Sequence, residues 1–261
     1  MEPITSRRNP LVARLRALHQ PKGRREQGLI LLEGTHQLQE LLRLALPPTH
    51  LLATSTWIER HPELIAACPH PPQLVGEAVL AAVATTESPD GVVATLAREQ
   101  LPQPRGSAQF VLALDQLQDP GNLGTLLRTA LAAGVEEVWL GGGADPLQPK
   151  VLRASAGAAL ALPLLRMGER GDLLAQVQQA RRAGLQVLAT SLDRAAQPYW
   201  QLDWRQPTLL LLGNEGAGVH PDLAALASHR VTIPHSAAVE SLNVAVAAAP
   251  LLLERWRQQG A

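Results

Sequence analysis

The sequence predicts an α/β protein of two domains, the second of which contains a mostly parallel sheet. Short runs rich in Val and Leu, such as "FVLALDQL" and "TLLLLGN", alternate with helix-like segments in the second half of the chain. Strands of this kind are buried on both faces, which is typical of parallel sheets covered by helices. With 261 residues, of which 46% are hydrophobic, the chain is long enough to bury a core in each domain.

A polar segment separates the two predicted domains. Residues 98–108 contain two prolines and one glycine and show no apolar periodicity, so we interpret them as a linker. The first domain then covers residues 1–97 and the second covers residues 109–261. In the first, a buried strand at residues 29–32 is followed by short helix-like and strand-like runs that end near Leu96, which predicts a small α/β unit.

The elements of the second domain follow from hydrophobic periodicity and from the glycines and prolines at their ends. A strand begins at residue 110, and a helix over residues 122–133 ends at Gly134. The later elements, in order, are a strand at 136–142, a helix from about Pro149, a strand at 162–167, a helix at 172–183, strands at 185–192 and 208–214, a short helix after Pro221, a strand at 230–234 and a helix at about 239–258. Pro250 lies inside that last helix, where proline costs roughly 3 kcal/mol unless the helix bends, so we predict a kink.

The charge distribution indicates where a polyanion could bind. The formal net charge is zero, so the chain lacks the overall basic excess of a protein that holds nucleic acid mainly by electrostatics. Residues 1–28, however, carry a net charge of +5 from Arg7, Arg8, Arg14, Arg16, Lys22, Arg24 and Arg25 against Glu2 and Glu26. This segment is the favoured polyanion contact, although a solvated terminus would have the same composition.

Several classes of protein are disfavoured by the composition. Cys68 is the only cysteine, so no disulfide can form within the chain, and no CxxC or HExxH spacing suggests a metal site. No run of about 18 apolar residues predicts a membrane span, and the segment after Arg7 and Arg8 is too charged for a signal peptide. We therefore expect a cytoplasmic protein that binds neither metal nor membrane.

The first stretch that suggests chemistry is "DPGNLGTLLRTALAAGV", residues 119–135. At the helical period, an apolar stripe faces the core and Arg128 projects away from it; the stripe is Leu123, Leu126, Leu127, Ala130 and Leu131. Gly124 lies one turn before Arg128 and could leave a notch for a ligand or phosphate, while Asn122 could cap the helix or bind a ligand. A surface arginine with a capping asparagine is the structural alternative.

The second stretch, "LLLLGNEGAGVHPDL", runs from a buried strand into a glycine-rich turn at the edge where open α/β sheets bind ligands. Its glycine spacing matches neither the dinucleotide fingerprint nor the phosphate loop. Glu215 within it argues against a phosphate cradle and suits an alcohol or amine ligand better. A tight strand-to-helix turn would explain the glycines but would account poorly for Glu215.

The third stretch, "VTIPHSAAVESLNVAVAAAPLLLERW", leaves a strand at Ile233, crosses a loop and enters an alanine-rich helix through Ser241, Leu242 and Asn243. By themselves, Ser241 and Asn243 are a modest capping signal, and alanine-rich helices usually belong to a core. The small side chains permit close packing of another helix.

In this order and at these spacings, the three stretches resemble the SpoU family of the SPOUT class of RNA methyltransferases. The first matches N-x-G-x-x-x-R-T-A, the second matches G-x-E-G-x-G, and the third matches I-P followed by E-S-L-N-V, so that the resemblance covers residues 110–254. The stretches "ITSRRNPLV", "LLEGTHQLQELL" and "PDGVVATL" are similar to the family's accessory domain, an α/β RNA-binding module that resembles certain ribosomal proteins.

The resemblance implies an α/β fold with a carboxyl-terminal trefoil knot that binds S-adenosylmethionine, and methyl transfer to a ribose 2'-hydroxyl. The implied cofactor-binding residues are Gly213, Asn214, Glu215, Ile233 and Leu242. The implied catalytic residues are Asn122, Arg128, Glu215, Ser241 and Asn243. Family mechanisms often make the arginine the base. Because arginine is effectively always protonated, we favour a role in holding the RNA phosphate and stabilising the developing alkoxide.

The resemblance also implies partners. Family members are homodimers, and the alanine-rich face of the last helix is a candidate interface. Relatives with an accessory domain mostly modify large-subunit rRNA, which favours 23S rRNA over tRNA. A resistance-type rRNA enzyme, a non-catalytic ribosome-assembly factor and, more remotely, a generic nucleotide-binding enzyme are the alternatives. The chain departs from the family pattern at His235, Ser236, Ala237 and Pro250, which affects the expected loop shape and helix geometry.

Overall fold

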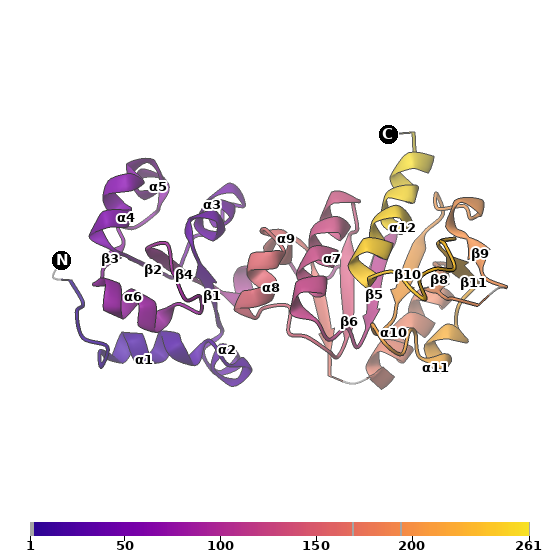
Figure 1. Ribbon diagram of the computed structural model, residues 1–261, viewed down its shortest axis with the longest axis horizontal. Coiled ribbons are helices and arrows are strands. Elements are labelled where there is room, and N and C mark those ends of the chain that lie inside the picture. The colour runs from indigo at the N-terminus through magenta and orange to yellow at the C-terminus, as the bar shows by residue number, and fades with distance from the viewer. Residues whose placement is uncertain (1–2, 169, 194, 261) are drawn as a thin grey trace. The chain divides into compact units, whose positions relative to one another are not determined.

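The computed structural model describes residues 3–168, 170–193 and 195–260. These residues form two compact units (Figure 1). The first unit contains the chain up to Leu101 together with Pro146–Ala161, and the second contains the rest. Among the described residues, no helix is both long enough and apolar enough to cross a membrane.

The first unit contains a four-stranded mixed sheet in the order β1-β4-β2-β3. Strand β4 pairs antiparallel with β1 and β2, and β2 pairs parallel with the short β3. The strands are β1 Leu29–Glu33, β2 His50–Ala53, β3 Gln73–Leu74 and β4 Val92–Ala97. The helices are α1 Pro10–Ala17, α2 Pro21–Gln27, α3 Thr35–Arg43, α4 Ser55–Arg60, α5 Pro62–Ala67, α6 Glu77–Val83, η1 Arg98–Gln100, α8 Pro149–Ala154 and α9 Ala158–Ala161. Apolar residues of α1, α6 and the sheet form the core.

The segment Pro146–Ala161 belongs to the first unit although we expected it in the second domain. Two polar contacts hold it there. Gln37 on α3 donates a hydrogen bond to the carbonyl of Leu152 at 3.1 Å, and Arg153 on α8 forms a 3.4 Å ion pair with the buried Glu33. Sequence-based boundaries follow the chain, so they cannot describe a segment that leaves one unit for the other. The boundaries at 1–97, 98–108 and 109–261 stay a prediction.

The second unit contains a seven-stranded parallel sheet in the order β7-β6-β5-β10-β8-β11-β9. The predicted mostly parallel α/β sheet is confirmed. Its strands are β5 Phe110–Asp115, β6 Glu137–Gly141, β7 Leu164–Met167, β8 Gln186–Thr190, β9 Gln197–Pro198, β10 Thr208–Leu212 and β11 His229–Thr232. The helices are α7 Pro120–Ala132, α10 Arg170–Arg182, η2 Tyr199–Gln201, α11 Pro221–Ala224 and α12 Val244–Gln258.

The order of the central strands places two loops side by side at the carboxyl edge of the sheet. The chain passes from β5 outward to β6 on one side, and β10 returns to pair with β5 on the other side. Leu114 is in register with Leu212, so the turns that follow β5 and β10 leave the sheet side by side. The carboxyl edge at such a reversal of strand order is where open α/β sheets bind ligands.

The last helix, α12, packs against α7 (Figure 1). It begins at Val244, five residues later than we predicted, and it continues as one helix across Pro250. Ala245 and Ala248 are buried, as expected for the alanine-rich face. The kink at Pro250 and the carboxyl-terminal knot stay predictions.

Candidate functional site

A cavity of about 700 Å³ opens at the carboxyl edge of the seven-stranded sheet. Its walls are the turns that follow β8, β10 and β11, together with α11 and the first half of α12. Seven of the nine residues predicted for the site line it: Gly213, Asn214, Glu215, Ile233, Ser241, Leu242 and Asn243. The other two, Asn122 and Arg128, lie on α7. The structure thus gathers segments that are far apart in the sequence.

The glycine turn that follows β10 is closed on itself. Asn214 and Gly218 exchange backbone hydrogen bonds of 3.1 and 2.9 Å, and the side chain of Asn214 accepts from the N–H groups of Gly216 and Ala217. A Cβ on Gly213 would lie 1.9 Å from the carbonyl carbon of Gly218, so only glycine fits there. Because these N–H groups already have acceptors, the turn is a poor phosphate cradle, in keeping with the sequence analysis.

Glu215 fastens this turn to the start of α7. Its carboxylate accepts hydrogen bonds from the backbone N–H groups of Asp119 at 3.0 Å and Gln118 at 3.2 Å, and from the side-chain amide of Asn122 at 3.4 Å. Desolvation alone would raise the pKa of Glu215, but these hydrogen bonds outweigh it and lower the pKa below its ordinary value. The side chain therefore carries a negative charge at neutral pH and holds the backbone at the start of α7 in place.

Asn122 has a different role from the capping role considered above. The cap of α7 is Asp119, whose carboxylate accepts from the N–H of Asn122 at 2.7 Å. The side chain of Asn122 is left to link Glu215 with Asn243, whose amide donates to the Asn122 oxygen at 3.0 Å. Asn243 in turn caps α12 through the N–H groups of Ala245 and Val246. A continuous chain of hydrogen bonds therefore connects the glycine turn, α7 and α12.

Arg128 is exposed on α7, as predicted. Within the described part of the chain, its guanidinium has no hydrogen bond or ion pair, so it is available to an anion. Two expectations for this helix are wrong. Gly124 is buried, which leaves no open notch beside Arg128, and Leu131 is 38% exposed instead of belonging to the core stripe.

Asp115 is a residue of this edge that the sequence analysis missed. It ends β5, is only 1% exposed, and binds the backbone of His220 and the side chain of Arg170. An acidic residue at the end of a wholly apolar strand was the available signal, since a buried carboxylate requires partners.

The cavity fits the size and chemistry of S-adenosylmethionine. Organic ligands generally occupy cavities of about 300–1,000 Å³ with mainly apolar walls and a few polar groups. Here Leu212, Val231 and Leu251 form apolar wall, and Ser241 and the ionised Glu215 supply polar groups. A carboxylate at this position suits a ligand that carries positive charge. Among the described residues, no group of three or more His, Cys, Asp or Glu side chains could hold a metal ion.

The basic segment of the first unit is largely on the surface. Arg7, Arg8, Arg14, Arg16, Lys22 and Arg25 are exposed. Arg24, which we counted with them, is buried and donates hydrogen bonds to the carbonyls of Leu18 and His19 at 2.8 and 2.9 Å. Its inclusion in a polyanion contact is therefore wrong, because its charge serves the turn between α1 and α2. Glu2, also counted in that segment, lies outside the described residues.

Two regions of the chain match known protein families. Residues 109–253 match the SpoU rRNA methylase family, and residues 9–94 match the MRM3-like substrate binding domain. The first match covers the seven-stranded sheet and the cavity, and the second covers most of the four-stranded sheet. Each of the two predicted regions thus has a counterpart in a known family.

The chain is also similar to individual RNA methyltransferases over nearly its whole length. An uncharacterized tRNA/rRNA methyltransferase of Synechocystis sp. is 46% identical, and the match covers 99% of this chain and 94% of that protein. The 23S rRNA (guanosine(2553)-2'-O)-methyltransferase RlmP of Bacillus subtilis is 34% identical, with 97% and 98% covered. The crystal structure of an AdoMet-bound rRNA methyltransferase from Sinorhizobium meliloti is 32% identical with a TM-score of 0.82, covering 100% of this chain and 99% of that one.

Proposed function

The chain belongs to the SpoU rRNA methylase family, and we propose that it transfers the methyl group of S-adenosylmethionine to a ribose 2'-hydroxyl of RNA, with 23S rRNA as the favoured substrate. The observation that carries this proposal is the cavity, because the glycine turn, Ile233 and residues 241–243 all line it. The name of RlmP supports 23S rRNA as the substrate, and the AdoMet-bound relative supports the cofactor.

The glycine turn, Ile233 and Leu242 would hold the cofactor, which when bound supplies an electrophilic methyl group. The chain has to bring the hydroxyl to that group and keep it in line. Asn122 and Asn243 meet at the rim of the cavity, and their hydrogen bond fixes the start of α12 relative to α7. Ser241 is exposed beside them and can bind the ribose.

Arg128 is the residue that we assign to the charge of the RNA. A guanidinium stays protonated in proteins, so it can hold a phosphate and stabilise the oxygen of the hydroxyl as that oxygen loses its proton. Its exposure and its lack of a partner among the described residues support this role over a structural one. The proton itself would then leave to water or to the RNA phosphate.

The first unit would select the RNA. Six exposed cations lie on or near α1 and α2, and arginine in particular binds phosphate through two parallel hydrogen bonds. Such contacts release counterions, so affinity for RNA should fall steeply as salt is raised. Affinity that did not change with salt would contradict this electrostatic role. A cytoplasmic location, expected from the single cysteine, stays a prediction.

The active form would be a homodimer that pairs through α12. The buried Ala245 and Ala248 are already used within the chain, which leaves the exposed flank beside them. On that flank Val246, Leu253 and Trp256 are 61%, 42% and 51% exposed, an apolar stripe at helical spacing. Sedimentation should show a dimer that Leu253→Glu converts to a monomer, whereas a monomeric wild-type protein would contradict the proposal.

The function is tested by incubating the protein with methyl-labelled S-adenosylmethionine and separate unmodified rRNA and tRNA pools. We expect labelled rRNA, with the label on a ribose. Arg128→Ala should reduce transfer about 100-fold or more, in line with the loss of one group that stabilises transition-state charge. Arg182→Ala removes an exposed arginine from α10 and serves as the matched control.

Each other outcome has a distinct meaning. Labelling of tRNA alone would contradict rRNA as the substrate while leaving the chemistry intact. Cofactor binding without transfer to either pool would favour a non-catalytic assembly factor. Equal loss in Arg128→Ala and Arg182→Ala would contradict the assigned role of Arg128.

A further inference from the structure

We propose that Asp115 is a positioning residue that fixes the far end of the glycine turn and so keeps the wall of the cofactor cavity in place. The inference rests on the proposed function, because it takes the cavity to be the binding site of S-adenosylmethionine. Asp115 does not line the cavity itself. It acts through His220, the residue at which the turn ends and α11 begins.

Both oxygens of the Asp115 carboxylate are engaged. One accepts a hydrogen bond from the backbone N–H of His220 at 3.0 Å, and the other forms a 3.0 Å ion pair with Nε of Arg170 at the start of α10. The side chain is 1% exposed. A carboxylate buried this deeply is tolerated only when it is paired and hydrogen-bonded, so the two contacts define where Asp115 can lie.

Asp115 and Glu215 link the β5 segment and the glycine turn reciprocally, because each carboxylate accepts from the backbone of the other segment. Asp115 belongs to the β5 strand and holds the backbone at His220, whereas Glu215 belongs to the glycine turn and holds the backbone at Gln118 and Asp119. Between them, the Asn214 amide donates to the carbonyl of Gln116 at 3.0 Å. The turn is thus fastened at three places to β5 and the segment that follows it. Of these, only Asp115 anchors it to a strand of the sheet.

The position of the contact explains why cofactor binding should depend on it. Residues 213–219 line the cavity, and so does Pro221 immediately after His220. Without the hydrogen bond at His220, the backbone around this residue loses its direct tie to β5, and the adjoining cavity wall can shift. Val219 and Leu223, on either side of His220, still pack in the core of the unit, so the fold does not depend on this bond alone. Loss of the contact should therefore affect cofactor affinity more than folding.

A pair of substitutions at His220 isolates the bond. His220 has a φ of −59°, which proline also adopts, so His220→Pro removes the donating N–H while preserving the backbone angle. His220→Ala keeps the N–H and removes only the imidazole, which accepts from the N–H of Asp222 at 3.3 Å. With S-adenosylmethionine alone, calorimetry should show Kd raised about tenfold in His220→Pro, the effect of one hydrogen bond to a charged group. His220→Ala should stay within about twofold of wild type.

A second pair separates positioning from general stability. Glu137 is a buried carboxylate at the amino end of β6 that accepts from the N–H groups of Arg105 and Gly106 and from the Trp139 indole. Asp115→Asn and Glu137→Gln both neutralise a buried, hydrogen-bonded carboxylate, so both should lower the thermal unfolding midpoint. Only Asp115→Asn should also raise the Kd for S-adenosylmethionine.

The outcomes distinguish this inference from the proposed function. If the wild-type protein binds the cofactor and His220→Pro binds it equally well, Asp115 has no positioning role and the proposed function stands. If Glu137→Gln weakens binding as much as Asp115→Asn, the effect is one of overall stability and the inference is wrong. If the wild-type protein does not bind S-adenosylmethionine, the proposed function fails and this inference fails with it.

Discussion

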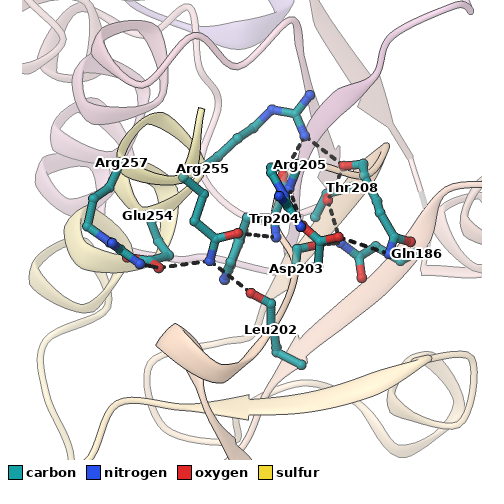
Figure 2. Close-up of polar contacts among 11 residues, drawn as sticks. Gln186, Leu202, Asp203, Trp204, Arg205, Thr208, Glu254, Arg255 and Arg257 are labelled. Atoms are coloured by element: carbon teal, nitrogen blue, oxygen red, sulfur yellow. Dashed lines mark hydrogen bonds and ion pairs between the residues drawn. The ribbon is translucent and has the colours of Figure 1, made fainter. Parts of the chain in front are cut away.

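The two edges of the seven-stranded sheet are both rich in polar contacts, but they use them differently. At the amino edge, the side chain of Gln258 accepts from the backbone N–H of Trp204 at 2.9 Å and donates to the carbonyl of Leu202 at 2.9 Å. Figure 2 labels Leu202, Trp204 and Arg255 of this cluster. Arg255 donates to the carbonyls of Trp204 and Gln206 at 2.8 and 2.7 Å. Side chains of α12 thus provide hydrogen-bond partners for the backbone groups of the loop before β10.

At the carboxyl edge, by contrast, the polar contacts surround an open cavity. Asn122 links Glu215 and Asn243 by hydrogen bonds, while Ser241 remains exposed near Asn243 and Arg128 is exposed further along α7. The same helix, α12, contributes Asn243 at one edge and Gln258 at the other. At the carboxyl edge, polar groups thus hold the loops around an open cavity, which can serve as a site. At the amino edge, polar groups join the loops to each other and to α12, which stabilises the fold.

The largest effect should come from filling the space of one glycine at each edge. Gly213→Ala places a methyl group 1.9 Å from backbone, so the turn must move, and we expect no measurable cofactor binding by calorimetry. Gly184, before β8 at the amino edge, has open space but a φ of +98°. Gly184→Ala should lower the free energy of unfolding by about 1–2 kcal/mol and leave the Kd unchanged. Comparable cofactor binding in both variants would contradict the distinction between the edges.

A smaller effect should follow from neutralising one carboxylate at each edge. Glu215→Gln replaces an acceptor by an NH₂ group that faces the N–H groups of Gln118 and Asp119, so the start of α7 should shift. We expect kcat/KM for RNA methylation to fall about tenfold or more. The control is Asp203→Asn at the amino edge, whose exposed partner Arg205 lowers the pKa of Asp203 to about 2. Exposed ion pairs contribute little, so its activity should match wild type.

The sequence predicts the components of this comparison better than their connections. The longer strands of the second unit, the glycine turn and the capping region of α12 were predicted because each follows from local periodicity or from a backbone requirement. The two-residue strand β9 was not, because it is too short to show a period. The identity of the α7 cap was not, because Asp119 and Asn122 can both cap a helix. Pro120 at the first helical position is consistent with the observed choice.

Long-range contacts account for most of what was missed. Glu215 and Asp119 are 96 residues apart, and Asn243 and Asn122 are 121 apart, so no local pattern announces either pair. The burial of Arg24 and the placement of Pro146–Ala161 in the first unit likewise depend on what packs nearby. The resemblance to a family named the residues of the site, but only the structure shows that Glu215 binds backbone.

Gln258 tests the amino edge alone. Gln258→Ala removes the contacts to Trp204 and Leu202 and one to Glu254, leaving a backbone N–H and a carbonyl without their partners. The free energy of unfolding should fall by about 1–3 kcal/mol in urea titrations. The Kd for S-adenosylmethionine and kcat should remain those of the wild-type protein, since α12 is capped independently at Asn243. A loss of kcat at temperatures where the variant is folded would show that the two edges are coupled through α12.

The smallest effect should be that of pH, and the pH range in which it appears distinguishes the two edges. Hydrogen bonds from Asp119, Gln118 and Asn122 outweigh desolvation and lower the pKa of Glu215 below its ordinary value of 4.5. A group whose pKa is lower in the folded protein stabilises it above the unfolded pKa and loses that contribution as pH falls through the folded pKa. Cofactor affinity should therefore be flat with respect to Glu215 from pH 8 to about 5 and decline only below that range. At the amino edge, the hydrogen bond from Arg257 lowers the pKa of Glu254. Protonation of Glu254 should therefore reduce the stability of the fold over a similar acid range, without changing cofactor affinity at neutral pH. Calorimetry of the wild type against Glu254→Gln checks this. A Kd that rose between pH 8 and 6 in both proteins would assign the cofactor site a titrating group other than Glu215, and a rise in the wild type alone would contradict the assignment of Glu254 to stability.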